Sequence, residues 1–278
     1  MMIESNGQKV LKVLLYVFLI LMAAIMLLPF LWMLSASLKE DRDVFTFPIQ
    51  WIPAEPRWQN YSDIWTRIPL LTYILNTVKL TIIVTLLQLF TSSFAAYAFS
   101  KLRFKGKNAL FLGYIATIAV PWQAYMVPQF MMLRGMGLNN THLAIIILQA
   151  FSAFGVFMMK QFYEGVPTEL CEAARIDGMT EYGIYAKIML PLAKPALSTL
   201  TIFTFVNTWN DFLGPYIYLT RDNLKTIQLG LRSFIGQYSS EYGLIMAGSV
   251  VTMIPVLAVF LSLQKYFVEG VASSGLKG

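Results

Sequence analysis

The chain is too apolar to be a soluble domain. Its 278 residues are 57% hydrophobic and only 13% charged, whereas about a quarter of the residues in soluble domains are charged. The formal net charge of +6 fits basic loops at a membrane face, so we expect no nucleic-acid partner. One histidine and one cysteine exclude an internal disulfide and a multi-cysteine metal site, and we expect this chain to bind no metal or cofactor.

Six long apolar stretches follow one another along the chain. A helix needs about 20 apolar residues to cross a bilayer core, and four of the stretches meet this length directly. The fourth in chain order reaches it with its flanks, and the fifth only by including Asp211. The stretches are Val13–Leu34, Leu80–Ser100, Ala109–Leu133, Leu143–Met159, Pro195–Asn210 continued by Phe212–Thr220, and Gly243–Gln264. We therefore expect an all-α integral membrane protein with six transmembrane helices.

Basic residues indicate the orientation of these spans. The loop after the second stretch contains Lys101, Arg103, Lys105 and Lys107, whereas the next loop contains only Arg134. Because short cytoplasmic loops carry the excess of Lys and Arg, the first of these loops should be cytoplasmic. Six spans then place both termini, and the loop at 160–194, on the cytoplasmic side. The first stretch exceeds the roughly 7–15 apolar residues of a signal-peptide core, so we expect it to remain as a span.

We expect three parts along the chain. Residues 1–70 should hold an N-terminal cytoplasmic segment, the first transmembrane helix and an external loop. Residues 71–268 should hold a five-helix core with the polar loop at 165–194, and residues 269–278 a cytoplasmic tail. The external segment at 221–242 is polar, and the sequence does not decide whether it caps the bundle, re-enters the membrane or contacts a partner.

The polar loop predicts a helix-turn-helix. Thr168 precedes a short helix with two glutamates in its first turn, where acids interact favourably with the positive helix end. Gly178 should end this helix, since glycine adopts the left-handed cap conformation without strain. Thr180 should begin a second helix, which Pro191 should end.

Small residues lie at the centre of the first of these helices. Ala173 and Ala174 present almost no side chain, so another surface can approach the backbone closely, and charged residues flank them. We therefore interpret the hairpin as a docking element on the cytoplasmic face. The alternative is an ordinary helical hairpin that lies on the membrane surface.

The spacing within this hairpin matches a known motif. It resembles, over its full length, the cytoplasmic loop of permease subunits in ATP-binding-cassette importers. The C-terminal half is similar to the smaller permease of maltose-type importers, which take up carbohydrates, and the resemblance covers nearly the whole chain. The matching residues are Glu172-Ala173-Ala174, Gly178, Ile188, Leu190 and Pro191 in the loop, with Trp209-Asn210-Asp211-Phe212 through Pro215 and Tyr266–Gly270 further on.

The resemblance implies a division of labour. The chain would form half of the translocation pathway for a sugar or oligosaccharide and would couple ATPase closure to alternating access. Its partners would be a second permease, two ATPase subunits that bind ATP-Mg, and an extracytoplasmic solute-binding protein, in a bacterial or archaeal inner membrane. Because the chain has no Gly-x-x-x-x-Gly-Lys-Ser/Thr phosphate loop, we expect a transport subunit with no catalytic residues, not an enzyme.

The resemblance also assigns roles to particular residues. The segment Glu169–Gly178 would be the coupling helix, which moves with the ATPase as a rigid body. The C-terminal tail would reach the ATPases through Lys277 and Gly278. The residues implied in ATPase coupling are Glu172, Ala173, Ala174, Arg175, Asp177 and Gly178.

Polar residues in the fifth stretch are candidates for the translocation pathway. At about 1.5 Å per residue, Asn207 lies roughly 18 Å and Asp211 roughly 24 Å from Pro195, within the membrane. Asn207 and Asn210 would offer amide hydrogen bonds to sugar hydroxyls, and Trp209 would stack on a sugar ring. Alternatively, these side chains bond to neighbouring helices, as polar groups in membrane bundles do.

Three function classes remain open at this stage. The first is a sugar-importer permease, and the second is an importer permease for another solute such as a glycerol phosphate, a peptide or an amino acid. The third is a membrane enzyme or an ion-coupled transporter, which predicts clustered intramembrane acids or histidines. One aspartate in the fifth stretch is a poor match to the third class. The sequence does not give the solute, the ATPase composition or whether this subunit touches the substrate.

Overall fold

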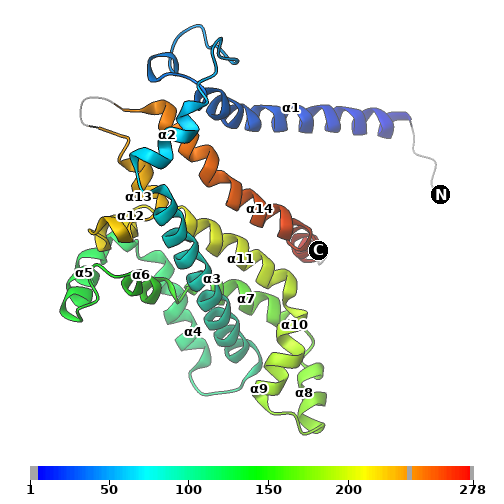
Figure 1. Ribbon diagram of the computed structural model, residues 1–278. Helices are drawn as coiled ribbons and strands as arrows, with labels where there is room; N and C mark the ends of the chain where they lie inside the picture. Colours follow the sequence, from blue (N-terminus) through cyan, green and yellow to red (C-terminus); the bar gives the residue numbers. More distant parts are fainter. Residues whose placement is uncertain (1–5, 237–239, 276–278) are drawn as a thin grey trace. The chain divides into compact units, whose positions relative to one another are not determined.

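The described part of the protein is helical. The computed structural model describes residues 6–236 and 240–275, with the side chains of the last helix described up to Lys265. Within these ranges there is no β-strand, only one isolated bridge between Ile235 and Ser240, and Figure 1 shows the helices in chain order. The all-α prediction is therefore confirmed. The expected tail contacts, Lys277 and Gly278, lie outside the described residues.

Four helical segments are long and apolar enough to cross a membrane. They are Lys9–Ala36 in α1 (Asn6–Ala36), all of α3 (Leu70–Lys101), His142–Glu164, and Tyr242–Lys265 in α14 (Tyr242–Gly275). A fifth candidate is the pair Glu181–Leu192 and Lys194–Trp209, whose two helices are bent by 78°. The chain is thus a multi-pass membrane protein, and the count of six spans and their orientation stay predictions.

The expected third span is divided into short pieces. It comprises α4 (Lys107–Ala116), the 3-10 turns η2 (Thr117–Ala119) and η3 (Trp122–Ala124), and α5 (Met126–Gly135). The break falls at Pro121, which lies between the two 3-10 turns and has no N–H to continue a helical ladder. By contrast, Pro128 and Pro255 lie inside α5 and α14.

The chain separates into two compact units. One comprises the residues up to 68 together with 231–253, and the other comprises 69–230 together with the residues from 254 on. The start of α14 therefore packs with the N-terminal part, a grouping that the sequence did not suggest.

The first unit contains η1 (Asp41–Asp43) and α2 (Gln59–Arg67). Asn60 is buried and donates from Nδ2 to the carbonyl oxygens of Ser37 and Lys39, both at 2.9 Å. The backbone N–H of Gly243 donates to Asp41 at 2.8 Å, which fastens the start of α14. By contrast, Trp58, directly before α2, and Trp65 within it are exposed.

The second unit is built around α3. This helix packs against α7 (Ala153–Glu164) and α11 (Lys194–Trp209), and the three lie side by side in Figure 1. Small residues allow the close approach, since a Cβ atom on Gly155 would lie 2.4 Å from Ser92 Oγ. Membrane helices commonly pack through such small residues.

Two further helix breaks lie in this unit. The segment His142–Glu164 divides into α6 (His142–Gln149) and α7, and α11 is followed by α12 (Leu213–Tyr218) after a break at Asn210–Phe212. The chain then passes through η5 (Asp222–Leu224) and α13 (Ile227–Arg232). Asn76 of α3 holds this return segment by donating to the carbonyls of Asn223 and Lys225 at 2.9 and 3.0 Å.

The polar loop folds as a hairpin of short helices. It comprises α8 (Glu169–Ile176), α9 (Glu181–Ile184), a π-helical segment η4 (Tyr185–Met189) and α10 (Leu190–Leu192). The prediction that Pro191 ends the second helix is wrong. The helical path passes through Pro191, which lies in the first turn of α10, and the bend follows at Ala193. The π-helical segment η4 lies directly before Pro191, and a helix can pass through a proline, which has no N–H, where its regular ladder of hydrogen bonds is already altered.

Candidate functional site

The turn of the hairpin is formed by local signals in the sequence. At the end of α8, Met179 N–H donates to Ala174 O at 2.9 Å and Gly178 N–H to Arg175 O at 3.0 Å. Gly178 has φ +81°, and a Cβ atom there would meet nothing within 4 Å, so glycine is required for its backbone conformation alone. Thr180 caps α9 by accepting from Gly183 N–H at 3.2 Å, as expected. Thr168, in contrast, does not cap α8 with its side chain.

The two faces of α8 differ sharply. Cys171 and Ala174 are buried in a core shared with α3, α7 and α11, so the small Ala174 side chain serves packing within the chain. Glu172, Ala173 and Asp177 are exposed. The exposed face also carries Leu170 and Ile176, the latter 86% exposed. These two apolar side chains are available to a surface that contacts α8, and motif matching missed both.

Arg175 does not point to the exposed face but forms an ion pair across the turn. Its Nε donates to Glu181 Oε1 at 2.6 Å and its Nη2 to Oε2 at 3.3 Å. Tyr97 of α3 donates its hydroxyl to the same carboxylate at 2.5 Å. The Arg175 hydrogen bonds, supported by the Tyr97 hydroxyl, lower the pKa of Glu181. One carboxylate thus joins α8 and α9 to α3.

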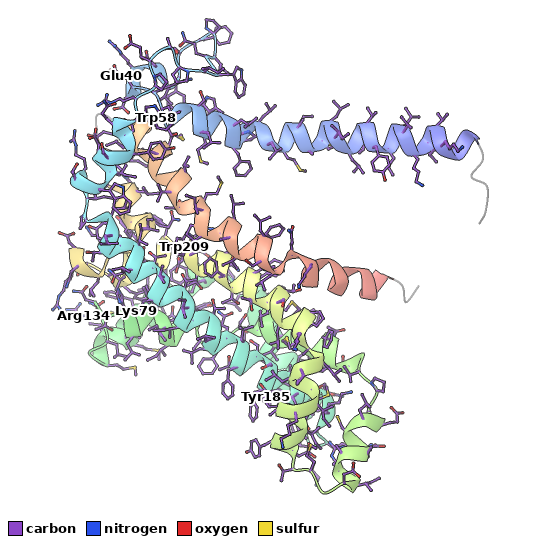
Figure 2. The ribbon with its side chains drawn as sticks, turned by 45° about the vertical axis from the view of Figure 1, so that its right-hand side comes forward. Glu40, Trp58, Lys79, Arg134, Tyr185 and Trp209 are labelled. Atoms are coloured by element: carbon purple, nitrogen blue, oxygen red, sulfur yellow. The ribbon has the colours of Figure 1, made fainter. Side chains whose placement is uncertain are left out.

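Little in the amino-acid sequence indicates this link. Arg175 and Glu181 are six residues apart on either side of a glycine turn, which is not the spacing of a helical ion pair. Tyr97 belongs to a different part of the chain, within α3. Figure 2 shows Tyr185, which follows α9, beside the same end of α3, and its ring lies 5.6 Å from that of Tyr97.

A recess lies next to this link. It has a volume of about 600 Å³ between the hairpin and the loop that follows α3. Lys101, at the end of α3, donates to the Val166 carbonyl at 2.6 Å and so fixes the chain just before α8. Charged groups of both signs line the recess, namely Lys101, Arg103, Glu172, Arg175 and Glu181.

Cys171 faces the interior of the hairpin. It is fully buried, with Sγ 3.7 Å from Met189 Sδ, and burial raises the pKa of its thiol. A buried, protonated thiol reacts slowly. Cys171 is therefore a poor target for thiol-reactive labels, although it is the single cysteine of the chain.

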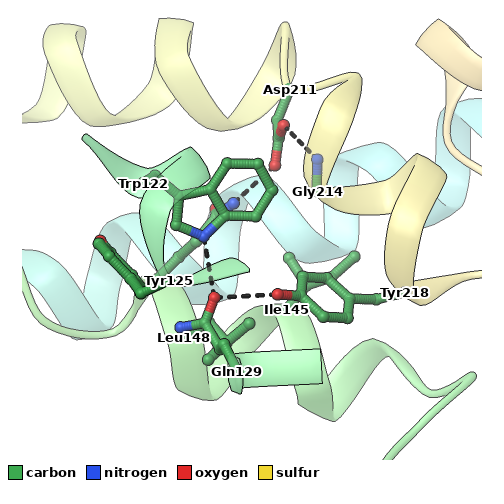
Figure 3. Close-up of a pocket in the computed structure, with 9 residues that line it drawn as sticks. Trp122, Tyr125, Gln129, Ile145, Leu148, Asp211, Gly214 and Tyr218 are labelled. Atoms are coloured by element: carbon green, nitrogen blue, oxygen red, sulfur yellow. Dashed lines mark hydrogen bonds between the residues drawn. The ribbon is translucent and has the colours of Figure 1, made fainter. Parts of the chain in front are cut away.

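A second candidate site is a cavity of about 260 Å³ inside the second unit. It opens where α5, α6 and α12 meet, and Figure 3 shows it from within. Asp211 accepts from Gln149 Nε2 at 2.7 Å and from Gly214 N–H at 3.1 Å. Trp122 Nε1 and the Tyr218 hydroxyl both donate to Gln129 Oε1, at 2.8 and 2.9 Å. The lining residues are Trp122, Tyr125, Gln129, Ile145, Leu148, Gln149, Asp211, Gly214 and Tyr218.

The structure separates the four expected pathway residues. Asp211 lines the cavity, but Asn207 and Asn210 are exposed elsewhere, and Asn210 accepts from Gln228 at 3.3 Å. Trp209 is only 1% exposed, and its ring stacks on Phe205 with centroids 5.6 Å apart. In this conformation Trp209 has no exposed ring face for a sugar, which favours the packing alternative at this position.

The other polar and aromatic groups of the cavity were not predicted. Trp122 and Tyr125 lie in the divided third span, and Gln149 lies at the end of α6. Each is unremarkable in its own segment, and only the fold brings them to Asp211. The one usable signal was Pro121, which indicated a break in that span.

Comparisons with known proteins agree with one another. Residues 5–273 match the family described as binding-protein-dependent transport system inner membrane component. The chain is 35% identical over 259 residues to the arabinooligosaccharides transport system permease protein AraQ of Halalkalibacterium halodurans, covering 92% of this chain and 93% of the relative. It is 32% identical over 259 residues to the lactose transport system permease protein LacG of Rhizobium radiobacter, covering 93% and 94%.

A solved structure also resembles the fold. It is the crystal structure of a bacterial ABC transporter involved in the import of the acidic polysaccharide alginate. The similarity covers 96% of this chain and 100% of that chain, with a TM-score of 0.82 and 25% sequence identity.

Proposed function

We propose that this chain, which belongs to the family of binding-protein-dependent transport system inner membrane components, is a permease subunit of an ATP-driven carbohydrate importer. The relatives are named for arabinooligosaccharide and lactose transport, and this supports a sugar or oligosaccharide as the solute. Family membership removes the third function class, a membrane enzyme or an ion-coupled transporter. ATP-Mg would bind and be hydrolysed on partner subunits.

The observation that carries the proposal is the two-faced hairpin. Its inner face is buried against α3, α7 and α11, whereas α8 exposes Leu170, Ala173 and Ile176 together with Glu172. A rigid element with a buried inner face transmits a force applied at its outer face without deforming. We place this outer face in a cleft of an ATPase subunit on the cytoplasmic side, with both termini of the chain on that side.

The remaining parts of the proposal follow from this arrangement. A second, similar permease would complete the translocation pathway as a heterodimer, and two ATPase subunits would each hold one coupling hairpin. An extracytoplasmic binding protein would deliver the carbohydrate. ATPase closure would then move α8 and, through the Arg175–Glu181–Tyr97 contacts, the helix α3.

The test is charge reversal on the outer face of α8. In the assembled importer, reconstituted with its binding protein, Glu172→Lys should lower carbohydrate uptake and sugar-stimulated ATP hydrolysis at least about tenfold, as loss of a charged interface contact does. Lys187→Glu is the matched control, because Lys187 is an exposed charged residue of the same hairpin that lies on η4 and not on α8. Unchanged uptake and ATP hydrolysis in Glu172→Lys would contradict the coupling role.

A further inference from the structure

Three helix breaks meet at the cavity beside Asp211. Trp122 and Tyr125 come from the break in the third span, Leu148 and Gln149 from the end of α6, and Asp211 from the break before α12. Helix breaks within a membrane free backbone groups, and they are tolerated where those groups are buried in protein or line a cavity. In transporters, discontinuous helices commonly form the substrate site near the middle of the membrane.

Hydrogen bonds to α3 show where along that helix the cavity lies. Gln88, near the middle of this helix, donates to the Gln149 carbonyl at 2.7 Å, and Thr91 donates to the Ala150 carbonyl at 2.8 Å. These bonds satisfy the carbonyls freed at the end of α6. Thr204 of α11 donates in turn to Gln88 Oε1 at 3.0 Å. The backbone of this break is thus stabilised by side chains outside the cavity lining, which leaves the lining groups available to a ligand.

The lining groups retain hydrogen-bonding capacity. Asp211 accepts from Gln149, Gly214 and the Leu213 backbone, and a carboxylate has about four acceptor sites, so one more donor can bind. Both acceptor sites of Gln129 Oε1 are occupied by Trp122 and Tyr218. The donor hydrogens of Gln129 are on its separate NH2 group. One acceptor and one donor in the lining of the same cavity match the hydroxyl groups of a sugar.

The apolar part of the lining is aromatic. The hydrogen bond from Trp122 Nε1 to Gln129 fixes the indole, and Figure 3 shows its ring next to the Asp211 carboxylate. Tyr125, at 41% exposure, also lines the cavity. Aromatic walls with a few placed polar groups are the usual construction of small-molecule sites, and the C–H face of a sugar ring packs well on such walls.

The volume limits the ligand. At about 260 Å³, the cavity is just below the roughly 300–1,000 Å³ of pockets for drug-sized ligands. One monosaccharide unit fits this space, whereas an oligosaccharide does not. A bound metal ion fits poorly, because the described residues contain no group of three or more acidic, histidine or cysteine ligands.

We infer that this cavity is a monosaccharide-sized site through which the subunit itself contacts the transported carbohydrate, with Asp211 and Gln129 bonding hydroxyl groups and Trp122 and Tyr125 packing on the ring. The inference rests on the proposed function. It assigns to this subunit a direct part in substrate recognition, in addition to coupling.

The test compares transport with ATP hydrolysis in the reconstituted importer. Tyr125→Ala removes one wall of the cavity at a partly exposed position and so preserves folding. It should lower carbohydrate uptake about tenfold, the effect of one lost favourable contact in a substrate site, while ATP hydrolysis stimulated by the loaded binding protein stays within about twofold of wild type. Tyr216→Ala is the matched control, because Tyr216 is 62% exposed on α12 and does not line the cavity.

A second variant separates recognition from packing. Asp211→Asn should shift the relative uptake rates of sugars that differ at one hydroxyl group, with an unchanged melting temperature of the complex. Equal losses of uptake and ATP hydrolysis, accompanied by a lower melting temperature, would assign the cavity a structural role and overturn the inference. Dependence of uptake on a sodium gradient that is lost in Asp211→Asn would also overturn it, in favour of a cation site.

The outcomes distinguish this inference from the proposed function. If wild-type importer takes up carbohydrate and both cavity variants match it in rate and preference, the inference fails and the proposed function stands. If wild-type importer takes up no carbohydrate but another solute, the proposed function itself fails.

Discussion

The hairpin and the cavity each contain one key carboxylate, but the two carboxylates have different partners. Glu181 pairs with the Arg175 guanidinium and accepts from Tyr97, which ties three helices together. Among the residues that the structure describes, the partners of Asp211 are neutral: an amide side chain and backbone N–H groups. A compensated charge at a surface turn serves to fix positions. A carboxylate inside a membrane bundle with neutral partners and a spare acceptor site is suited to bind a polar substrate.

The largest effect should come from the contact between α3 and α7, because both the hairpin and the cavity region are bonded to α3. Gly155→Leu forces a side chain into the contact between α3 and α7, where even a Cβ atom would lie 2.4 Å from Ser92 Oγ and 3.3 Å from Leu200. Overpacking of this kind costs about 1–3 kcal/mol or more, so we expect a much lower yield and melting temperature of the complex. Gly113→Leu is the control, since a Cβ atom there meets nothing within 4 Å. Equal yields for the two variants would show that α3 and α7 do not pack as described.

The next effect tests the hairpin without touching the cavity. Glu181→Ala leaves Arg175 without its partner and detaches the hairpin from Tyr97, so we expect carbohydrate uptake to fall about fivefold with little change in sugar preference. Tyr97→Phe should have a smaller effect and add nothing in the double variant, because both changes remove the same link. Glu164→Ala serves as the control, since its ion pair with Lys160 lies outside the hairpin link. Additive losses for Glu181 and Tyr97 would contradict a shared role.

A smaller effect should follow from the turn. Gly178→Ala retains all contacts, because the added methyl group meets nothing, but it places alanine at φ +81°. The left-handed conformation costs about 1 kcal/mol for alanine, so protection of the hairpin amides from hydrogen exchange should fall modestly. Protection equal to that of the wild type would mean that the hairpin does not adopt this turn in the membrane.

The smallest effect is a dependence on pH. The pKa of Glu181 is lowered in the folded hairpin, chiefly by Arg175, so its stabilising contribution is complete above the unfolded value of about 4.3. That contribution is lost as the pH falls through the folded pKa. The protection factor of the Met179 amide, which is the intrinsic exchange rate divided by the observed rate at the same pH, should therefore fall in acid, and Glu181→Gln should abolish this dependence. A pH response that persists in Glu181→Gln would assign it to another group.

The sequence predicted the hairpin better than the cavity, for physical reasons. The turn at Gly178 and the cap at Thr180 follow from local backbone requirements that a short segment displays. The burial of Ala174 and Trp209, and the passage of the helix through Pro191, depend on packing against other helices and were not visible. The cavity combines Trp122, Gln149 and Asp211 from three distant segments, so no local pattern contained it.

The most direct test of the coupling role is the accessibility of the outer face of α8. Ala173→Cys, in a Cys171→Ala background, presents one thiol on this face. A membrane-impermeant maleimide should label it in inside-out vesicles and not in right-side-out vesicles, and the ATPase subunits should block the labelling. Glu55→Cys, in the expected external loop within residues 1–70, should be labelled in right-side-out vesicles and not in inside-out vesicles. Labelling of Ala173→Cys from the outer surface would contradict the account.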